Sequence, residues 1–329
     1  MIDGSQLRQD IVSGDWIVVA PKRAKRPHQL LEKKKRIKAP VKNCPFENPQ
    51  KSGNAEPILT YPNRNNWRVQ IIPNKYPALI HKNACSKFFK KGPYSVMDGV
   101  GHHDIVISRD HYKNFAHLGK KDADLVFKSF QDRYRILAKD SCLAYILIFH
   151  NWGLKAGASV YHPHYQIISV PVVPPDVEHS LLGSFNYFKK NKKCVHCVMI
   201  EWEKKNKSRI IYENEGAIVF TPFVSRQSFE MRVFPKKHHS YFEDMSAKNL
   251  SFITDALQKA LLRLEKKLGD PDYNFFIHTA PVSNKKKYHH YHWHIEIQPQ
   301  IRISAGFELA TGVEIIDVDP DEAAKILKS

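Results

Sequence analysis

The chain has 329 residues, of which 42% are hydrophobic, so it is long enough to bury a full globular core. No apolar stretch approaches the roughly 20 residues that a membrane-spanning helix needs, and residues 1–16 lack the pattern of a secretory signal. The formal net charge of +18 favours anionic partners such as phosphates, nucleotides or nucleic acid.

The basic charge is carried by short lysine-rich runs between segments that look structured. These runs lack the interleaved aromatic residues of RNA-binding sheets, so we interpret them as solvated loops and do not expect nucleic acid as the main partner. They lie at 33–36, 189–193 and 285–287.

Cysteines are few, and their number is odd. Without a signal sequence, such a set predicts reduced thiols and a cytoplasmic protein. The five are Cys44, Cys85, Cys142, Cys194 and Cys197. Only Cys194 and Cys197 have the spacing of metal ligands.

In chain order, the first clear helix is predicted at 121–140, where apolar residues recur at helical spacing. A strand-like run at 143–151 follows, and then the stretch "YHPHYQIISVP" at 161–171. After a basic, polar stretch near 175–193, a second helix is predicted at 246–267, with Ser246 as its N-cap. A second strand-like run covers 273–281.

This order indicates an internal duplication. His150 and His162 are twelve residues apart, as are His278 and His290, so we align His162, His164 and Gln166 with His290, His292 and His294. The predicted fold class is α+β, with two related units that each consist of an antiparallel sheet and packed helices. The predicted domains are 1–180, which is catalytic, and 181–329.

Strand alternation gives the stretch at 161–171 a chemical meaning. Residues two apart on a strand share a face, so His162, His164 and Gln166 should project together, and buried polar groups need partners. A single histidine is more often a satisfied structural residue than a ligand, but this pattern occurs twice.

Metal binding is one explanation for the repeated histidines. Zinc prefers four thiolate and imidazole ligands, which favours a second-half site of Cys194, Cys197, His238 and His292. The corresponding first-half set is weaker because Glu47 stands where a second cysteine would be, and it could bind zinc, another metal or none. That set is Cys44, Glu47, His111 and His162.

Nucleophilic catalysis is the second explanation. A neutral imidazole at His164 can attack phosphorus and hold the transferred group. The amide of Gln166 and the hydroxyl of Ser159 can bind phosphate oxygens without titrating, and Gly153 and Gly157 allow the backbone to approach a phosphate closely.

In their combined order, several blocks resemble the galactose-1-phosphate uridylyltransferase family of the histidine-triad superfamily. The blocks are "VVAPKRAKRPHQ" 18–29, "WRVQIIPNKYPAL" 67–79, "GHHDIVIS" 101–108, "NWGLKAGASVYHPHYQ" 151–166, "HWHIEIQP" 292–299 and "AGFELATG" 305–312. The resemblance implies two fused histidine-triad units, each a half-barrel sheet with helices, and commonly a homodimer.

The resemblance also implies residue roles. His164 would carry the nucleotidyl group, Gln166 and Ser159 would contact the transferred phosphate, and Cys44, His111 and His162 would bind structural zinc. The substrate-binding residues that it implies are Arg23, Arg26, Asn74, Asn151, Gly157, Arg302, Phe307 and Glu308. Of these, the C-terminal three would approach the sugar phosphate in the site of a partner subunit.

Two departures from the family pattern concern the first-half metal site and the substrate. Glu47 replaces a cysteine, and Val313 lies near the place of a hexose-recognising glutamine. The segment "GFELATG" and the Cys194–Cys197 pair resemble the ADP-glucose phosphorylase branch of the family.

Three functions follow from these features. The first is transfer of UMP or AMP between a nucleotide sugar and a sugar phosphate or inorganic phosphate. The second is phosphorolysis or hydrolysis of an ADP-sugar or a dinucleoside polyphosphate. The third is nucleic-acid binding with a relic site.

Overall fold

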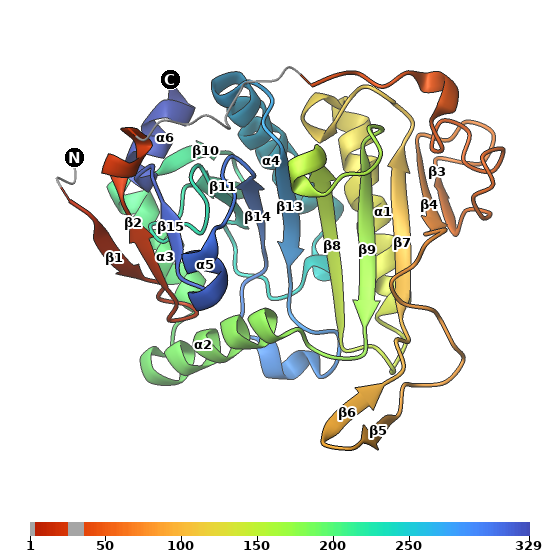
Figure 1. Cartoon of the computed structure of the whole chain (residues 1–329), viewed down its shortest axis with the longest axis horizontal. Helices are drawn as coiled ribbons and strands as arrows, with labels where there is room; N and C mark the ends of the chain where they lie inside the picture. Colours follow the sequence, from red (N-terminus) through yellow and green to blue (C-terminus); the bar gives the residue numbers. More distant parts are fainter. Residues whose placement is uncertain (1–3, 26–35) are drawn as a thin grey trace.

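The computed structural model of the protein describes residues 4–25 and 36–329, and its centre is one large sheet. The strands of this sheet are β3 (Leu59–Tyr61), β4 (Val69–Pro73), β7 (His102–Ser108), β8 (Tyr145–Trp152), β9 (His164–Val170), β10 (Ile210–Glu213), β11 (Ala217–Phe220), β12 (Met231–Pro235), β13 (Tyr273–His278) and β14 (His294–Pro299). They run in the order β10-β11-β12-β14-β13-β8-β9-β7-β4-β3, and every neighbouring pair is antiparallel (Figure 1). The α+β class is confirmed, and the two halves meet where β8 pairs with β13.

Two long helices cover one face of this sheet (Figure 1). They are α1 (Lys120–Leu137) and α4 (Ala247–Leu268), close to the ranges that the apolar spacing predicts. The side chain of Ser246 accepts a hydrogen bond from the Asn249 N–H at 3.3 Å and caps α4, as expected. Because the odd-numbered positions of β9, such as Ile167, face this apolar layer, the even-numbered positions His164 and Gln166 lie on the opposite, polar face.

A small sheet joins the two ends of the described chain. It consists of β1 (Gln6–Gln9), β2 (Trp16–Val19) and β15 (Glu314–Ile316), in which β15 runs parallel to β2. The remaining helices are α2 (Pro175–Asn191), α3 (Val195–Asn206), α5 (Gly306–Thr311) and α6 (Pro320–Lys328). The short 3-10 turns are η1 (Pro21–Lys25), η2 (Val41–Asn43), η3 (Phe115–His117), η4 (Leu154–Ala156), η5 (Phe242–Asp244) and η6 (Lys285–Tyr288). The stretch near 175–193 is therefore largely helical, and the lysines at its end are exposed.

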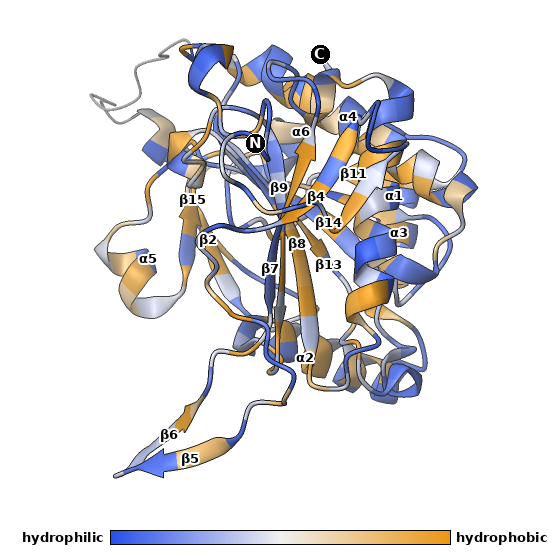
Figure 2. Ribbon diagram, turned by 90° about the vertical axis from the view of Figure 1, so that its right-hand side faces the viewer, coloured by the Kyte–Doolittle hydropathy of each residue, from blue (hydrophilic) through white to orange (hydrophobic). Residues whose placement is uncertain are grey.

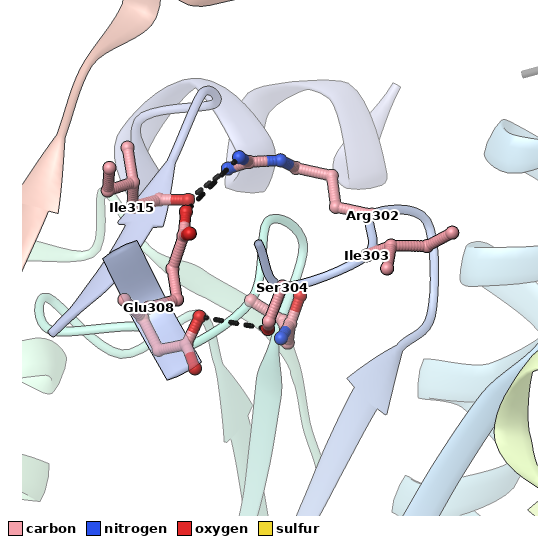
Figure 3. A pocket seen from close by; sticks show the side chains of 7 residues that line it. Arg302, Ile303, Ser304, Glu308 and Ile315 are labelled. Atoms are coloured by element: carbon pink, nitrogen blue, oxygen red, sulfur yellow. Dashed lines mark hydrogen bonds and ion pairs between the residues drawn. The ribbon is translucent and has the colours of Figure 1, made fainter. Parts of the chain in front are cut away.

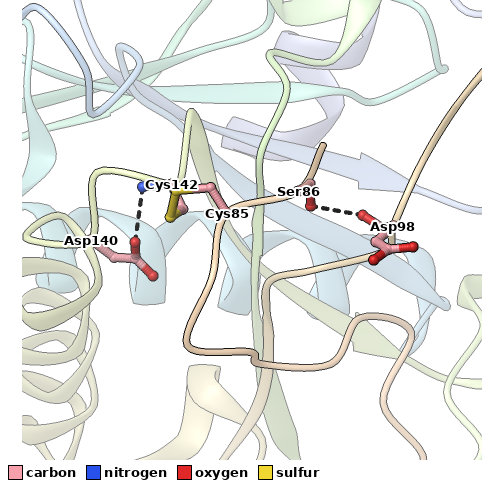
Figure 4. Close-up of a disulfide and its surroundings, with 5 residues drawn as sticks. All are labelled: Cys85, Ser86, Asp98, Asp140 and Cys142. Carbon is pink, nitrogen blue, oxygen red and sulfur yellow. Dashed lines mark hydrogen bonds between the residues drawn. A yellow bond between two sulfur atoms is a disulfide. The ribbon is translucent and has the colours of Figure 1, made fainter. Parts of the chain in front are cut away.

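A hairpin of β5 (Phe88–Lys91) and β6 (Tyr94–Met97) extends away from the body of the protein (Figures 1 and 2). Just before it, Cys85 forms a disulfide with Cys142, which lies in the turn after α1 (Figure 4). The prediction of reduced thiols is wrong for these two cysteines, because the fold brings together residues 57 apart in sequence. Within the described residues, no helix is long and apolar enough to cross a bilayer.

The duplication is present, but its register differs from the one that we predicted. His164 begins β9 and His294 begins β14, and the ring of each lies close to the backbone oxygen of the histidine two residues earlier. His164 therefore corresponds to His294, and Gln166 corresponds to Glu296. The equal spacing of twelve residues misled the alignment, because the loop between the paired strands is longer in the second half.

Candidate functional site

His164 lies at the start of β9, on the polar face of the sheet. Its Nδ1 is 2.9 Å from the backbone oxygen of His162, so Nδ1–H donates there and Nε2 keeps its lone pair. His164 is 7% exposed, and its burial lowers its pKa from the usual value. A neutral imidazole with a free Nε2 is the form that can act as a nucleophile.

The side chain of Gln166 is oriented by a histidine on the neighbouring strand. Nε2 of His103 lies 2.8 Å from Oε1 of Gln166, and Nδ1 of His103 accepts the Ala78 N–H at 3.1 Å. His103 thus carries its proton on Nε2 and donates it to the Gln166 oxygen. The amide nitrogen of Gln166 remains as a donor for an anionic oxygen. The Asn74 amide nitrogen lies 3.0 Å from the same Nε2 of His103, which has no lone pair to accept from it once it carries the proton.

A recess of about 260 Å³ opens beside these residues, on the same face of the sheet. Its lining comes from β8 and β13 and consists of Leu147, Phe149, Asn151, Asn274 and Phe276. Phe149 lies directly across from Gln166 in the pairing of β8 with β9, so the recess adjoins Gln166 and its partner His103. Asn274 donates to Oδ1 of Asn151 at 2.8 Å, which leaves the Asn151 amide nitrogen available to a ligand.

Both glycines of the loop after β8 have positive φ, but side chains of the protein, rather than open space for a phosphate, lie next to Gly153. Gly153 and Gly157 have φ of 89° and 86°, the region where only glycine is free of strain. A Cβ on Gly153 would lie 1.9 Å from Oδ1 of Asp272, whose other oxygen accepts the Lys155 N–H at 2.7 Å. Ser159 is exposed at the end of this loop and has no hydrogen-bond partner among the described residues.

Three side chains of the predicted first-half metal set converge. The donor atoms of Cys44, His111 and His162 lie within 4.8 Å of one another, and Nδ1 of His111 is 3.2 Å from Nδ1 of His162. Each ring directs its Nε2 to a backbone oxygen, at 2.9 Å from Ala39 and 2.7 Å from Ser108, so the two facing Nδ1 atoms both carry lone pairs. Two acceptors face each other only at a cost unless a cation lies between them, so the arrangement fits a metal ion.

The fourth member of that set lies elsewhere. The carboxylate of Glu47 pairs with Arg109 at 3.4 Å, and Glu47 is not among the described residues whose donor atoms converge with Cys44. Burial of His162 lowers its pKa to about 4, which keeps the ring neutral and able to bind a metal.

The second-half metal set comes together completely. The donor atoms of Cys194, Cys197, His238 and His292 lie within 4.8 Å of one another. Sγ of Cys197 is 3.4 Å from Nδ1 of His238 and 3.5 Å from Nδ1 of His292. A hydrogen bond from Cys197 lowers the pKa of Cys194, so one thiolate forms readily in the pair. This is a Cys₂His₂ donor set of the kind that zinc prefers, and its ion would join α3 to the segment after β12 and the segment before β14.

The predicted substrate-binding residues at the two ends of the chain lie apart from His164. Arg23 lies in η1, directly after β2, and Arg26 falls outside the described residues. Arg302 donates to the backbone oxygen of Ile315, and its guanidinium is 3.8 Å from Glu308 (Figure 3). Both views of the fold place α5, with the half-exposed Phe307, beside β15 rather than beside β9 (Figures 1 and 2).

Comparison with known proteins places this site in a family. Residues 1–174 match the family description "Galactose-1-phosphate uridyl transferase, N-terminal domain". This chain belongs to the galactose-1-phosphate uridyl transferase family. Residues 193–303 match the description "Scavenger mRNA decapping enzyme C-term binding".

Relatives of known activity match nearly the whole chain. ADP-glucose phosphorylase of Arabidopsis thaliana is 32% identical, over 98% of this chain and 92% of the relative. Galactose-1-phosphate uridylyltransferase of Thermotoga maritima is 26% identical, over 98% of each chain. Since both are transferases of this family, the chain is an enzyme of the nucleotidyltransferase type, as the motifs predicted.

Solved structures agree with this assignment. The crystal structure of an ADP-glucose phosphorylase from Arabidopsis thaliana with bound ADP-glucose has a TM-score of 0.86 at 30% identity and covers 99% of both chains. A structure described as a uridylyltransferase has a TM-score of 0.76 at 26% identity, over 98% of this chain and 97% of its own.

Sequence reasoning missed three residues that shape this uridyl transferase-like site. Phe46 lies with its ring 5.0 Å from that of His164, His103 holds Gln166, and the fully buried His150 donates to the backbone oxygen of His164 at 2.7 Å. The alternation of side chains along the strand at 102–108 places His103 on one face of the sheet and His102 on the other. Only the pairing of β7 with β9 shows that Gln166 is the partner of His103.

Proposed function

We propose that the protein transfers a nucleotidyl group from a nucleotide sugar to inorganic phosphate through a covalent intermediate on His164. The observation that carries the proposal is the pairing of a neutral, oriented imidazole with a free amide donor two residues along the same strand. A non-titrating amide at Gln166 binds a phosphate oxygen but does not activate water, which favours a phosphate acceptor over hydrolysis.

The reaction would proceed in two steps. Nε2 of His164 attacks the α-phosphorus of the nucleotide sugar, the bond to the bridging oxygen breaks, and a sugar 1-phosphate leaves. An oxygen of inorganic phosphate then attacks the same phosphorus, the P–N bond breaks, and a nucleoside diphosphate leaves. During both steps the amides of Gln166 and Asn151 stabilise charge on the phosphorus-bound oxygens.

An ADP-sugar is the substrate that we favour. The support is the similarity to the Arabidopsis ADP-glucose phosphorylase and the complete Cys194–Cys197 donor set. Transfer of UMP to galactose 1-phosphate is the second candidate, since the Thermotoga relative carries that name.

Zinc in the cysteine–histidine clusters, a homodimer and a cytoplasmic location belong to the same proposal. Zinc would supply structural cross-links, with the second-half cluster the stronger site because it offers four ligands. The dimer is supported by the separation, within one chain, of α5, which carries Phe307 and Glu308, from β9, which begins at His164. A reducing compartment suits the free thiols Cys44, Cys194 and Cys197, whereas the Cys85–Cys142 disulfide is stable in an oxidising one.

Mass spectrometry of the intact enzyme after incubation with ADP-glucose and UDP-glucose in separate samples tests the mechanism. We expect an adenylyl adduct on His164 that disappears when phosphate is added. His164→Asn should form no adduct, and His164→Gly should regain turnover when imidazole is supplied. The matched control is His179→Asn, an exposed histidine on α2. Normal turnover by His164→Asn would exclude the mechanism, and release of nucleoside monophosphate without phosphate would favour a hydrolase.

A further inference from the structure

A third group of metal-binding side chains lies away from both cysteine–histidine clusters. One donor atom each of His81, His102 and Asp140 lies within 4.8 Å of the other two. His102 begins β7 and points to the α1 face, opposite to its neighbour His103, which contacts Gln166. The group is therefore separated from the candidate active site by the sheet itself.

Backbone contacts fix the segment that carries His81. The Ile80 N–H donates to the Gly99 oxygen at 3.0 Å, and the Gly101 N–H donates to the Ile80 oxygen at 3.2 Å. Since Gly101 directly precedes β7, these bonds hold His81 next to His102, and the two rings lie 4.4 Å apart.

The disulfide links the same two regions of the chain. Cys85 follows His81 by four residues, and Cys142 follows Asp140 by two. The Cys142 N–H donates to Oδ1 of Asp140 at 2.9 Å (Figure 4), so Oδ2 is left for another partner. The disulfide thus limits how far the carboxylate can move from the imidazoles.

We propose that His81, His102 and Asp140 form a binding site for a divalent metal ion of the zinc type. Two imidazoles and one carboxylate are a donor set that suits zinc and similar borderline ions, and it leaves coordination positions for water. Hard cations such as Mg²⁺ prefer sites made only of oxygen atoms and should bind poorly.

One neighbouring cation limits the affinity of this site. The Arg133 guanidinium lies 3.4 Å from Nδ1 of His102, but its charge is balanced by Asp104 at 2.7 Å. Binding of a metal ion at Nε2 requires a proton on Nδ1, so the Arg133 contact must lengthen. We therefore expect weaker binding here than at the Cys₂His₂ cluster.

Titration calorimetry with ZnCl₂ tests the site, with wild type and variants purified identically so that only their difference is interpreted. We expect the wild type to bind one more equivalent than His81→Ala, and Asp140→Asn to lower the affinity of this equivalent at least tenfold. The Asn variant keeps an acceptor for the Cys142 N–H. Because His81 is exposed, its removal should leave the unfolding temperature unchanged. His179→Ala, also exposed, is the control.

A second readout locates the ion. Zinc should protect His81 from acylation by diethylpyrocarbonate, read by peptide mass spectrometry, and should leave His179 reactive. Equal zinc binding by wild type and His81→Ala, absence of protection, or equal displacement by Mg²⁺ would each overturn the proposal.

Discussion

Nε2 of His103 lies 2.8 Å from Oε1 of Gln166, across the pairing of β7 with β9. A residue on a neighbouring strand thus decides which end of the glutamine amide faces a substrate. His103 is a positioning residue here, because it acts on the substrate through Gln166.

Replacement of His103 by Ala should therefore lower kcat by about 10–100-fold, the usual range for loss of a group that orients another, with little change in KM. Single-turnover kinetics of nucleotidyl transfer measure this effect. His103→Gln can donate to the same oxygen and should restore part of the rate. An equal loss in the Gln variant would contradict the positioning role.

The pH dependence of the first step should report the buried state of His164. Its pKa is lowered mainly by burial, so the neutral nucleophile persists below the usual histidine value of about 6.5. The rate of adduct formation should be constant above pH 6.5 or so, about the usual histidine pKa, and should fall only at lower pH, as the ring of His164 becomes protonated. Rates measured without phosphate avoid the titration of the acceptor.

The Phe46 ring is part of that burial, which provides a matched variant. Phe46→Ala admits water to His164 and should raise its pKa. The fall in the rate of adduct formation at low pH should therefore begin at a higher pH than in the wild type. If the pH dependence of adduct formation is unchanged in this variant, the Phe46 ring does not control the ionisation of His164.

Loss of the metal ion that we propose for the second-half cluster should destabilise the fold. Cys197→Ser removes a ligand that contacts both His238 and His292, and each buried donor left without a partner costs about 1–3 kcal/mol. We expect a lower metal content and a lower unfolding temperature, measured by elemental analysis and calorimetry. Lys204→Gln, an exposed change on the same helix, should alter neither.

Mixing of two inactive variants tests whether the C-terminal segment serves a partner subunit. Phe307 is 50% exposed, so Phe307→Ala should fold normally and lose activity only if the ring contacts substrate. Refolded mixtures of His164→Asn and Phe307→Ala should regain activity, because one site of each mixed dimer contains both native residues. No recovery in proven mixed dimers would place both residues in one chain's site.

Local patterns in the sequence were sufficient to predict the elements with strong periodicity. The apolar spacing predicted α1 and α4 to within a few residues, and Ser246 caps α4 as expected. The second-half cluster followed from cysteine spacing and zinc chemistry, and its four donor atoms lie within 4.8 Å of one another.

Features that depend on tertiary pairing could not be predicted in the same way. The Cys85–Cys142 disulfide and the contact of His103 with Gln166 join residues 57 and 63 apart, which no local period reveals. The predicted alignment of the two halves was wrong for a related reason. The length of a loop is free to vary between the halves, whereas the pairing of the strands is not.

The junction of β8 with β13 has a consequence for synthesis of the protein. The nascent chain completes β8 more than a hundred residues before β13 leaves the ribosome. Until then the inner edge of β8 exposes unpaired backbone groups, as an open sheet edge does. During that interval a second nascent chain could add its own β8 there, so slow translation or truncation after the first half should favour aggregation.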